Sequence, residues 1–259
     1  MFPFDYLRPA GVAEAVAAHG QDGEPRYLAG GQSLLAAMKL RLAAPSVLID
    51  IARLPALRGI RRDGAVLVVG AAATHAEMAE GAGIAALAAL AGSIGDRQVR
   101  HMGTLGGSLA HNDPAGDHAA GVLGLGASIR TDRRVIAADA FFLGMFETAL
   151  APGEMIVEVA YPLPRRAGYA KIRNPASGYA VAGVFVAETA AGIRVAVTGA
   201  GACVFRLPEF EAALSREFSP AALAGLTVAE DDLNRDLHAS AAYRAHLIGV
   251  LAGRAVAAS

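Results

Sequence analysis

The sequence predicts a chain of the α+β class, with alternating elements in its first part and a strand-rich region followed by helices in its second part. Three observations support this. Tyr27–Ala29 reads as a short strand that enters a glycine turn, and residues 33–42 and 47–51 follow as a helix and a buried strand. From about residue 126 the pattern changes to short apolar runs separated by turn residues. Beyond residue 166, three such runs are spaced as an antiparallel meander.

The first 55 residues are expected to form a small α/β unit. Residues 9–19 read as a helix, because Pro9 suits a first helical turn and apolar residues recur along one stripe. Ser33 can cap a second helix that runs through about Leu42, before Pro45 ends it. This helix would turn four side chains inward: Leu34, Leu35, Met38 and Leu42. Its N-terminus would face the glycine turn, and a helix N-terminus favours an anion.

The next stretch combines helices with strands. Thr74 and Glu77 form a capping box that opens a helix, and Asp113 followed by Pro114 reads as a helix start that places Asp117 in the first turn. An alanine- and leucine-rich segment reads as a further helix, at 84–93. The expected strands are 66–69, 127–131, 135–136 and 155–161.

The last part begins after a proline- and arginine-rich linker at 162–166. Its three expected strands are Tyr169–Arg173, Tyr179–Glu188 and Ile193–Thr198. A final helix is expected near 240–258. Four residues are expected on its inward face: Tyr243, Leu247, Val250 and Leu251.

Composition excludes several classes of function. A net charge of −1 over 259 residues gives no general attraction to nucleic acid or to an anionic membrane. A single cysteine, Cys203, allows neither an internal disulfide framework nor an iron–sulfur cluster held by this chain, which takes about four thiolates. We expect no signal peptide and no membrane span, and a cytoplasmic location.

Two glycine clusters are the strongest functional motifs, at residues 29–33 (AGGQS) and 104–108 (TLGGS). Adjacent glycines bring backbone N–H groups close to a ligand, and a hydroxyl adds a further donor, which is how phosphate oxygens are held. One such pair is more often a plain turn. Two pairs, roughly 70 residues apart, suggest that two loops hold one diphosphate, so a dinucleotide is the expected ligand.

Three separated strings carry a family resemblance: AGGQSLLAAMKLRLAAPSVLIDI (29–51), GDRQVRHMGTLGGSLAHNDPAGD (95–117) and DLHASAAYRAHLIGVLAGRAV (236–256). In this order and spacing they resemble the FAD-binding medium subunit of molybdenum-containing hydroxylases, in particular the aerobic carbon monoxide dehydrogenase medium chains, which are related to the flavin domain of xanthine dehydrogenase. The resemblance runs nearly from end to end.

The resemblance implies a division into domains. Residues 1–165 would be an FAD-binding domain of the vanillyl-alcohol-oxidase (PCMH) type, in two α/β parts at about 1–55 and 56–165. Residues 166–259 would be a C-terminal domain of the carbon monoxide dehydrogenase flavoprotein type, with a three-stranded antiparallel sheet and helices.

The resemblance also implies which residues bind FAD. Two backbone loops would hold the pyrophosphate, and Asp117 matches a carboxylate that the family uses on the dinucleotide. Ile94 would pack against the cofactor, and Ile156, Lys171 and Tyr179 match positions near the isoalloxazine ring. The loop residues are Ala29, Gly30, Gly31, Gln32, Ser33 and Leu34 in the first loop, and Thr104, Gly106, Gly107 and Ser108 in the second.

No catalytic acid, base or nucleophile arrangement is evident, so substrate oxidation is expected in another subunit. The resemblance implies a small subunit with two [2Fe–2S] clusters and a large subunit with the molybdopterin cofactor, in a dimer of heterotrimers. Electrons would pass from the clusters through FAD to an external acceptor. The large subunit would determine the substrate.

Other interpretations stay open at this stage. The run 111–118 contains two histidines and two aspartates and could suggest a metal site, although no further ligands lie at a suitable spacing. The run 198–203 imitates a nicotinamide fingerprint but has Val204 at the third glycine position. Lys171 and Tyr179 could be plain strand residues. The chain could also be a stand-alone flavin oxidase, or an assembly module without flavin.

Overall fold

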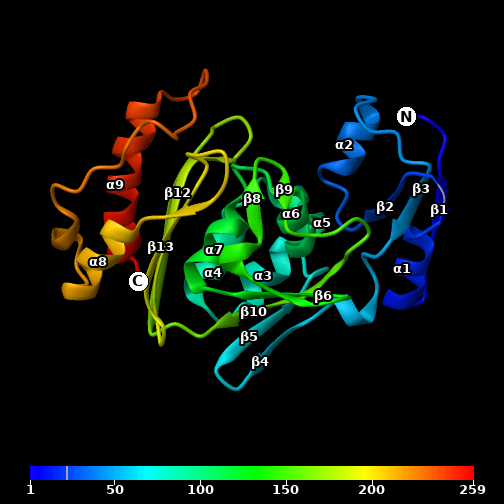
Figure 1. The fold of residues 1–259 in the computed structure, drawn as a ribbon, viewed down its shortest axis with the longest axis horizontal. Helices are drawn as coiled ribbons and strands as arrows, with labels where there is room; N and C mark the ends of the chain where they lie inside the picture. The colour runs from blue at the N-terminus through cyan, green and yellow to red at the C-terminus, as the bar shows by residue number, and fades with distance from the viewer. Residues whose placement is uncertain (22) are drawn as a thin grey trace.

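The computed structural model describes residues 1–21 and 23–259 and confirms the α+β class. Three sheets follow one another across the molecule (Figure 1). The N-terminal sheet and its helices lie at one end, a five-stranded sheet lies in the middle, and the C-terminal sheet with its covering helices lies at the other end. The chain termini therefore lie on opposite sides of the molecule.

The N-terminal sheet contains three parallel strands in the order β1 (Asp5–Leu7), β3 (Val47–Asp50) and β2 (Pro25–Leu28). Helix α1 (Val12–His19) precedes β2, and helix α2 (Leu34–Lys39) connects β2 to β3. The predicted strand, glycine turn, helix and strand are thus present.

Both N-terminal helices are shorter than predicted. Helix α1 begins after Gly11 and not at Pro9. Helix α2 ends at Lys39, and Leu42 lies beyond it with 79% of its surface exposed, so the prediction that Leu42 faces inward is wrong. Pro45 does not set the end, because Arg41 already takes a left-handed φ of 60°.

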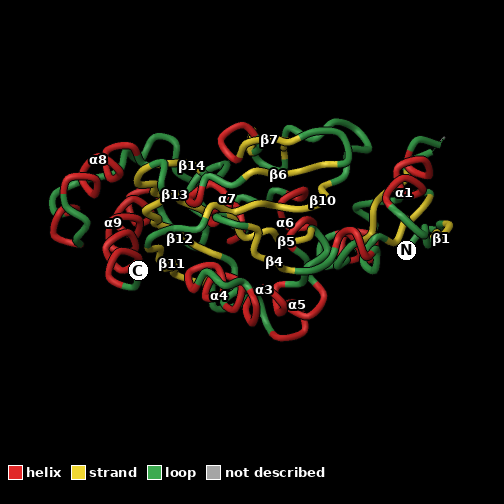
Figure 2. The backbone as a smooth tube through the Cα atoms, turned by 90° about the horizontal axis from the view of Figure 1, so that it is seen from below, coloured by secondary structure: helices red, strands yellow, loops and turns green. Residues whose placement is uncertain are grey.

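The central sheet is antiparallel throughout, and its strands lie side by side in Figure 2. Their order is β4 (Ile60–Asp63), β5 (Val66–Gly70), β10 (Ile156–Pro162), β6 (Ser128–Thr131) and β7 (Val135–Ala137). Between β5 and β6 the chain forms five helices: α3 (His75–Gly81), α4 (Ala85–Gly92), α5 (Arg97–Met102), α6 (Leu105–His111) and α7 (Asp117–Leu125). A small hairpin, β8 (Phe142–Gly144) and β9 (Glu147–Thr148), precedes β10.

One helix start in this region differs from the prediction. The capping box at Thr74 and Glu77 is present. However, Asp113 does not cap α7, because its Oδ1 accepts a hydrogen bond from Ala115 N (2.8 Å) within a turn, and the helix begins after Gly116. Asp117 still lies in the first turn of α7, as predicted.

The C-terminal sheet is an antiparallel meander of four strands, not three. The strands are β11 (Arg166–Arg173), β12 (Ala180–Thr189), β13 (Gly192–Thr198) and the two-residue β14 (Phe205–Arg206). Side chains of β12 alternate between two cores: Val184 and Val186 face the helices α8 (Pro208–Arg216) and α9 (Ala241–Ala257), whereas Phe185 faces α7. The sheet is therefore buried on both faces (Figure 1).

Helix α9 has the predicted position but a different buried face. Leu247 and Leu251 are buried as predicted, whereas Tyr243 and Val250 are exposed at 48% and 37%. Arg244 is buried in their place, and its guanidinium donates to Gly199 O (2.9 Å) and to Asp236 Oδ2 (2.6 Å). Three short 3₁₀ helices, Pro55–Leu57, Ala138–Ala140 and Pro220–Leu223, complete the fold, and none of the described helices is long and apolar enough to span a membrane.

Candidate functional site

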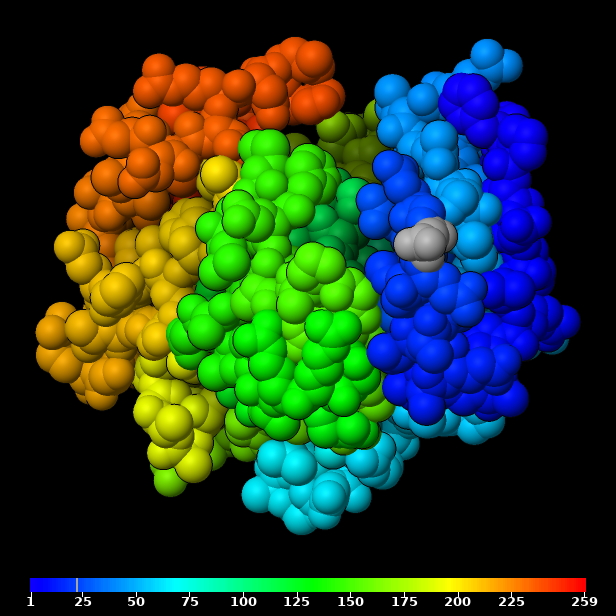
Figure 3. Space-filling view, turned by 45° about the vertical axis from the view of Figure 1, so that its right-hand side comes forward, coloured from blue at the N-terminus to red at the C-terminus, as the bar shows by residue number. Residues whose placement is uncertain are grey.

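A deep cleft of about 880 Å³ lies where the N-terminal, central and C-terminal parts meet. Figure 3 shows it as a hollow between the blue N-terminal part and the green central part. Its volume is near the upper end of the roughly 300–1,000 Å³ range of small-molecule sites. Many of the residues that line it come from the first glycine loop, the second glycine loop, the β8–β9 hairpin and the loop before β12.

The first glycine loop has unused hydrogen-bond donors. Among the described residues, the backbone N–H groups of residues 31–34 make no hydrogen bond with the protein. The Ser33 side chain does not cap α2, contrary to prediction, so its hydroxyl also stays available. Gly31 takes a left-handed φ of 69°, which glycine adopts without strain and which is typical of anion-binding turns of the backbone. A turn with several free N–H groups favours a phosphate oxygen.

The second glycine loop is constructed differently. Thr104 caps α6 by accepting a hydrogen bond from Gly107 N (3.2 Å), and Gly106 N donates to Ala71 O (2.8 Å). Its N–H groups are therefore largely used inside the protein. This loop contributes the backbone surface of Gly106 and Gly107, which carries no side chains, and the half-buried side chain of Ser108.

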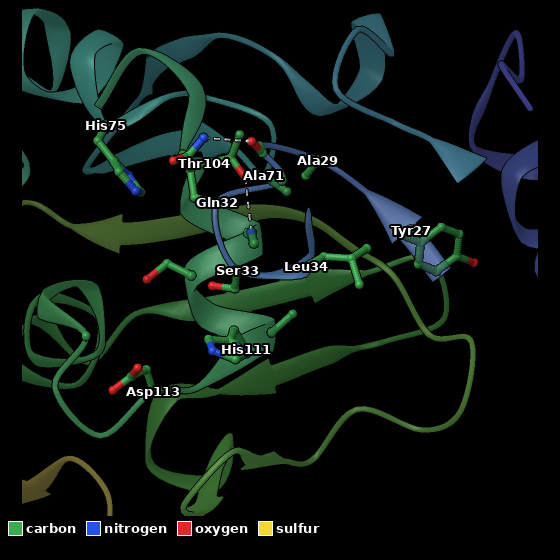
Figure 4. Close-up of a pocket in the computed structure, with 18 of the residues that line it drawn as sticks. Tyr27, Ala29, Gln32, Ser33, Leu34, Ala71, His75, Thr104, His111 and Asp113 are labelled. Atoms are coloured by element: carbon green, nitrogen blue, oxygen red, sulfur yellow. Dashed lines mark hydrogen bonds between the residues drawn. The ribbon is translucent and has the colours of Figure 1, made fainter. Parts of the chain in front are cut away.

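Residues of both loops, including Gln32, Ser33 and Thr104, line the same cleft (Figure 4). At Gly30 the first loop packs against residues 102 and 103, which lead into the second loop. A Cβ atom on Gly30 would lie 2.2 Å from the carbonyl oxygen of Met102 and 2.8 Å from the Cα of Gly103. Only glycine allows the loops to approach this closely. The sequence predicted that both clusters serve one ligand, and the structure brings them together around one cleft.

Fourteen of the fifteen predicted binding residues line this cleft. They are Ala29, Gly30, Gly31, Gln32, Ser33, Leu34, Ile94, Thr104, Gly106, Gly107, Ser108, Asp117, Ile156 and Tyr179. The exception is Lys171, whose side chain is 5% exposed and turns to Asp117.

Lys171 and Asp117 form a buried ion pair beside the cleft. Lys171 Nζ donates to Asp117 Oδ1 (2.7 Å) and to the carbonyl oxygen of Gly178 (3.0 Å), and the Tyr169 hydroxyl also donates to Asp117 Oδ1. Burial raises the pKa of Asp117, and the Lys171 ammonium and the Tyr169 hydroxyl oppose that shift. Through Gly178, Lys171 also holds the loop that carries Tyr179.

The β8–β9 hairpin supplies an aromatic wall that the sequence did not indicate. Phe146 lines the cleft, has a left-handed φ of 56° and stays 54% exposed. The buried side chain of Asn112 fixes this hairpin, because its Nδ2 donates to Gly144 O (2.8 Å) and Glu147 O (2.7 Å). Asn112 O in turn accepts a hydrogen bond from Phe146 N (3.1 Å).

His75 is a second cleft residue that no sequence pattern indicated as a binding residue. It is the first residue of α3, and its Nδ1 lies 2.9 Å from Nε2 of the buried His118. Burial, with a smaller contribution from the charge of Arg100, lowers the pKa of His75 to about 4. The capping box alone explains why Thr74 and Glu77 occur at this spacing. The sequence pattern therefore did not single out the histidine between them.

These features fit a bound dinucleotide such as FAD. The unused N–H groups of the first loop and the Ser33 hydroxyl suit a diphosphate, and apolar side chains such as Ile94 and Ile156 suit aromatic rings. Within residues 1–21 and 23–259, no three His, Cys, Asp or Glu side chains are grouped so as to hold a metal ion. The run 198–203 comprises the last residue of β13 and the bends that follow it, and none of its residues lines the cleft.

Comparison with known proteins identifies relatives of the whole chain. Residues 2–164 match the family described as FAD binding domain in molybdopterin dehydrogenase. The carbon monoxide dehydrogenase medium chain of Hydrogenophaga pseudoflava is 35% identical and aligns over 99% of this chain and 96% of its own length. The nicotine 6-hydroxylase medium subunit of Paenarthrobacter nicotinovorans is also 35% identical, over 97% of this chain and 95% of its own.

Solved structures show the same similarity. A carbon monoxide dehydrogenase from Hydrogenophaga pseudoflava, which lacks the Mo-pyranopterin moiety of the molybdenum cofactor, superposes with a TM-score of 0.86 at 36% identity, covering 100% of this chain and 98% of that chain. Quinoline 2-oxidoreductase from Pseudomonas putida 86 superposes with a TM-score of 0.88 at 26% identity, covering 99% and 97%.

Proposed function

The chain belongs to the family of FAD-binding domains in molybdopterin dehydrogenases, and we propose that it is the FAD-carrying electron-transfer subunit of a heterotrimeric molybdenum hydroxylase or dehydrogenase. The observation that carries this proposal is the cleft between the two glycine loops, with its free N–H groups at residues 31–34. Relatives of the full chain are medium subunits of such enzymes, which supports the same role.

The first loop would hold the FAD pyrophosphate with its N–H groups and the Ser33 hydroxyl, and the second loop would close over it from Thr104 to Ser108. Asp117 would bind a polar group of the dinucleotide, and Ile94 would exclude water from its apolar part. Near the isoalloxazine ring we place Ile156 and Tyr179, with Lys171 acting on that region through Asp117 and Gly178.

Bound FAD would accept electrons singly from iron–sulfur centres and release them in pairs, and the protein would tune that exchange by placement and local charge. The chain's own residues bind and orient the cofactor. We propose that the clusters belong to a small [2Fe–2S] subunit and that substrate oxidation takes place in a large molybdopterin subunit. Support comes from the single cysteine of this chain.

Finer features of the assembly are also proposals. They are a dimer of heterotrimers, an external acceptor that takes electrons from FAD, and a cytoplasmic location. We further propose domain limits at 1–165 and 166–259. The strand β10 belongs to the central sheet and β11 to the C-terminal sheet, and residues 163–165 connect them. The parts 1–55 and 56–165 carry separate sheets, which supports the subdivision.

Two alternative functions are less well supported. A stand-alone flavin oxidase would need its own substrate-binding domain, and residues 166–259 are occupied by a sheet that is buried on both faces. An assembly module without flavin would have no need for a cleft of about 880 Å³ in which the N–H groups of residues 31–34 make no hydrogen bond with the described part of the chain.

The partner proposal predicts a division of labour between subunits. We expect this chain to co-purify with an iron–sulfur subunit and a molybdenum subunit when the three are co-expressed. We expect the FAD-loaded chain alone to oxidise no organic substrate, because no catalytic acid, base or nucleophile arrangement is evident in its sequence. Affinity purification and a dye-reduction assay test this. Steady turnover by the isolated chain would contradict it, and the assembled complex is the positive control.

A further inference from the structure

Two histidine side chains form a buried pair at the edge of the cleft. His75 belongs to α3 and His118 to the first turn of α7, and their facing nitrogens, Nδ1 of His75 and Nε2 of His118, lie 2.9 Å apart. His118 has no exposed surface, whereas His75 is 5% exposed and lines the cleft. The pair thus connects the protein interior with the cofactor site.

Burial favours the neutral form of both rings. Burial lowers the pKa of His75 to about 4, and burial together with the nearby His75 and Lys171 lowers the pKa of His118 well below its usual value. A neutral imidazole has one N–H group and one bare nitrogen. The hydrogen bond between the rings can therefore form in two ways, and the two ways leave different atoms facing the cleft.

The buried side of the pair decides between the two arrangements. Nδ1 of His118 is buried and has no hydrogen-bond partner in the described part of the chain. If His75 Nδ1–H were the donor, His118 would carry its proton on this isolated Nδ1, and a buried N–H without a partner is rare and costly. If His118 Nε2–H is the donor, the isolated atom is a bare acceptor, which is better tolerated. The second arrangement places the proton of His75 on Nε2.

That Nε2 lies beside Gly103, which immediately precedes the second glycine loop. A Cβ atom on Gly103 would lie 2.6 Å from it, and the backbone N–H of His75 donates to Gly103 O (3.0 Å), which fixes the ring beside the loop. Figure 4 shows His75 next to Thr104. Within residues 1–21 and 23–259, Nε2 makes no hydrogen bond to the protein.

We propose that His75 presents a neutral Nε2–H donor to the cleft and hydrogen-bonds an acceptor atom of bound FAD, while His118 acts as a positioning residue that fixes this tautomer. The inference rests on the proposed function in so far as FAD is the ligand. It adds a donor at the second loop, whose backbone N–H groups are largely used within the protein. It also gives the buried histidine pair a role in cofactor binding in addition to its packing.

The first test measures the tautomer directly. The full chain, labelled with ¹⁵N-histidine, is examined by long-range ¹H–¹⁵N correlation before and after addition of FAD. We expect protonated Nε2 and bare Nδ1 on both His75 and His118, and a shift of the His75 Nε2 resonance on addition of FAD. A protonated Nδ1 on His75, or an unchanged Nε2 resonance in the FAD-loaded chain, would overturn the inference and leave the proposed function intact. Absence of FAD binding would overturn both.

The second test measures the FAD dissociation constant by quenching of flavin fluorescence. We expect His75→Phe to weaken binding by about tenfold, the effect of one lost hydrogen bond. His75→Gln keeps an amide donor and should recover most of the affinity. His246→Phe, at an exposed site on α9, is the matched control. Equal FAD affinity of the wild type and a folded His75→Phe variant would contradict the proposal. If that variant does not fold, the tautomer measurement on the wild-type chain tests the proposal instead.

Discussion

Gly30→Ala is expected to weaken FAD binding by about tenfold to hundredfold and to leave the chain folded. The added Cβ atom would lie 2.2 Å from Met102 O and 2.8 Å from the Cα of Gly103, so two backbone segments must separate. Overpacking of this kind costs about 1–3 kcal/mol, and each 1.4 kcal/mol is a factor of ten in affinity. The cost falls on the cleft, because Gly30 and Gly103 both line it.

The matched control for this variant is Gly11→Ala. Gly11 precedes α1 with an extended φ of −161°, and nothing lies within 4 Å of a Cβ atom placed there. We expect its FAD affinity and its free energy of unfolding to equal those of the wild type. Flavin fluorescence and urea unfolding measure both quantities. A Gly30→Ala chain that binds FAD as tightly as Gly11→Ala would show that the contact between the loops does not shape the cofactor site.

Lys171→Met is expected to lower the free energy of unfolding by about 3–5 kcal/mol, the usual effect of leaving one member of a buried ion pair without its partner. Asp117 is 3% exposed and would lose both the charge and the hydrogen bond of Lys171. The loop at Gly178 would lose its bond to Nζ, so FAD binding should weaken as well. Lys39→Met, at an exposed position near the end of α2, is the control and should be nearly neutral.

The loss in Lys171→Met should depend on pH in a defined direction. Burial already raises the pKa of Asp117, and removal of Lys171 removes the largest opposing influence. Above about pH 4 the unfolded carboxyl is ionised while the folded one retains its proton, so the folded state binds more protons and the free energy of unfolding falls as pH rises. Urea unfolding should therefore show a smaller deficit at pH 5 than at pH 8. Adding Asp117→Asn should restore part of the loss, and a deficit that grows toward acid pH would contradict this explanation.

Much of the site could be predicted from the sequence because its main elements are local. A glycine pair beside a hydroxyl residue is visible in the sequence, and the two clusters do lie on one cleft. The capping box at Thr74 was also correctly located. Each depends on residues within four positions of one another, which a linear pattern records.

The remaining features depend on contacts between distant residues. The buried face of α9 includes Arg244 because the carbonyl oxygen of Gly199 and the carboxylate of Asp236 satisfy its guanidinium, and apolar periodicity cannot anticipate a buried charge. Asn112 holds a hairpin more than thirty residues further along the chain. Likewise, Ser33 immediately precedes α2 as predicted, but its side chain makes no capping hydrogen bond.

The most direct measurement of the central claim is the FAD content of the purified protein. The chain, alone or with its partner subunits, is denatured with acid or heat, and the supernatant is analysed for flavin by chromatography and absorbance. We predict one FAD per chain, released completely, because the cleft offers hydrogen bonds and no nucleophile in a flavin-attachment motif. A folded chain that assembles with its partners, shows no flavin absorbance and releases no FAD would contradict the account.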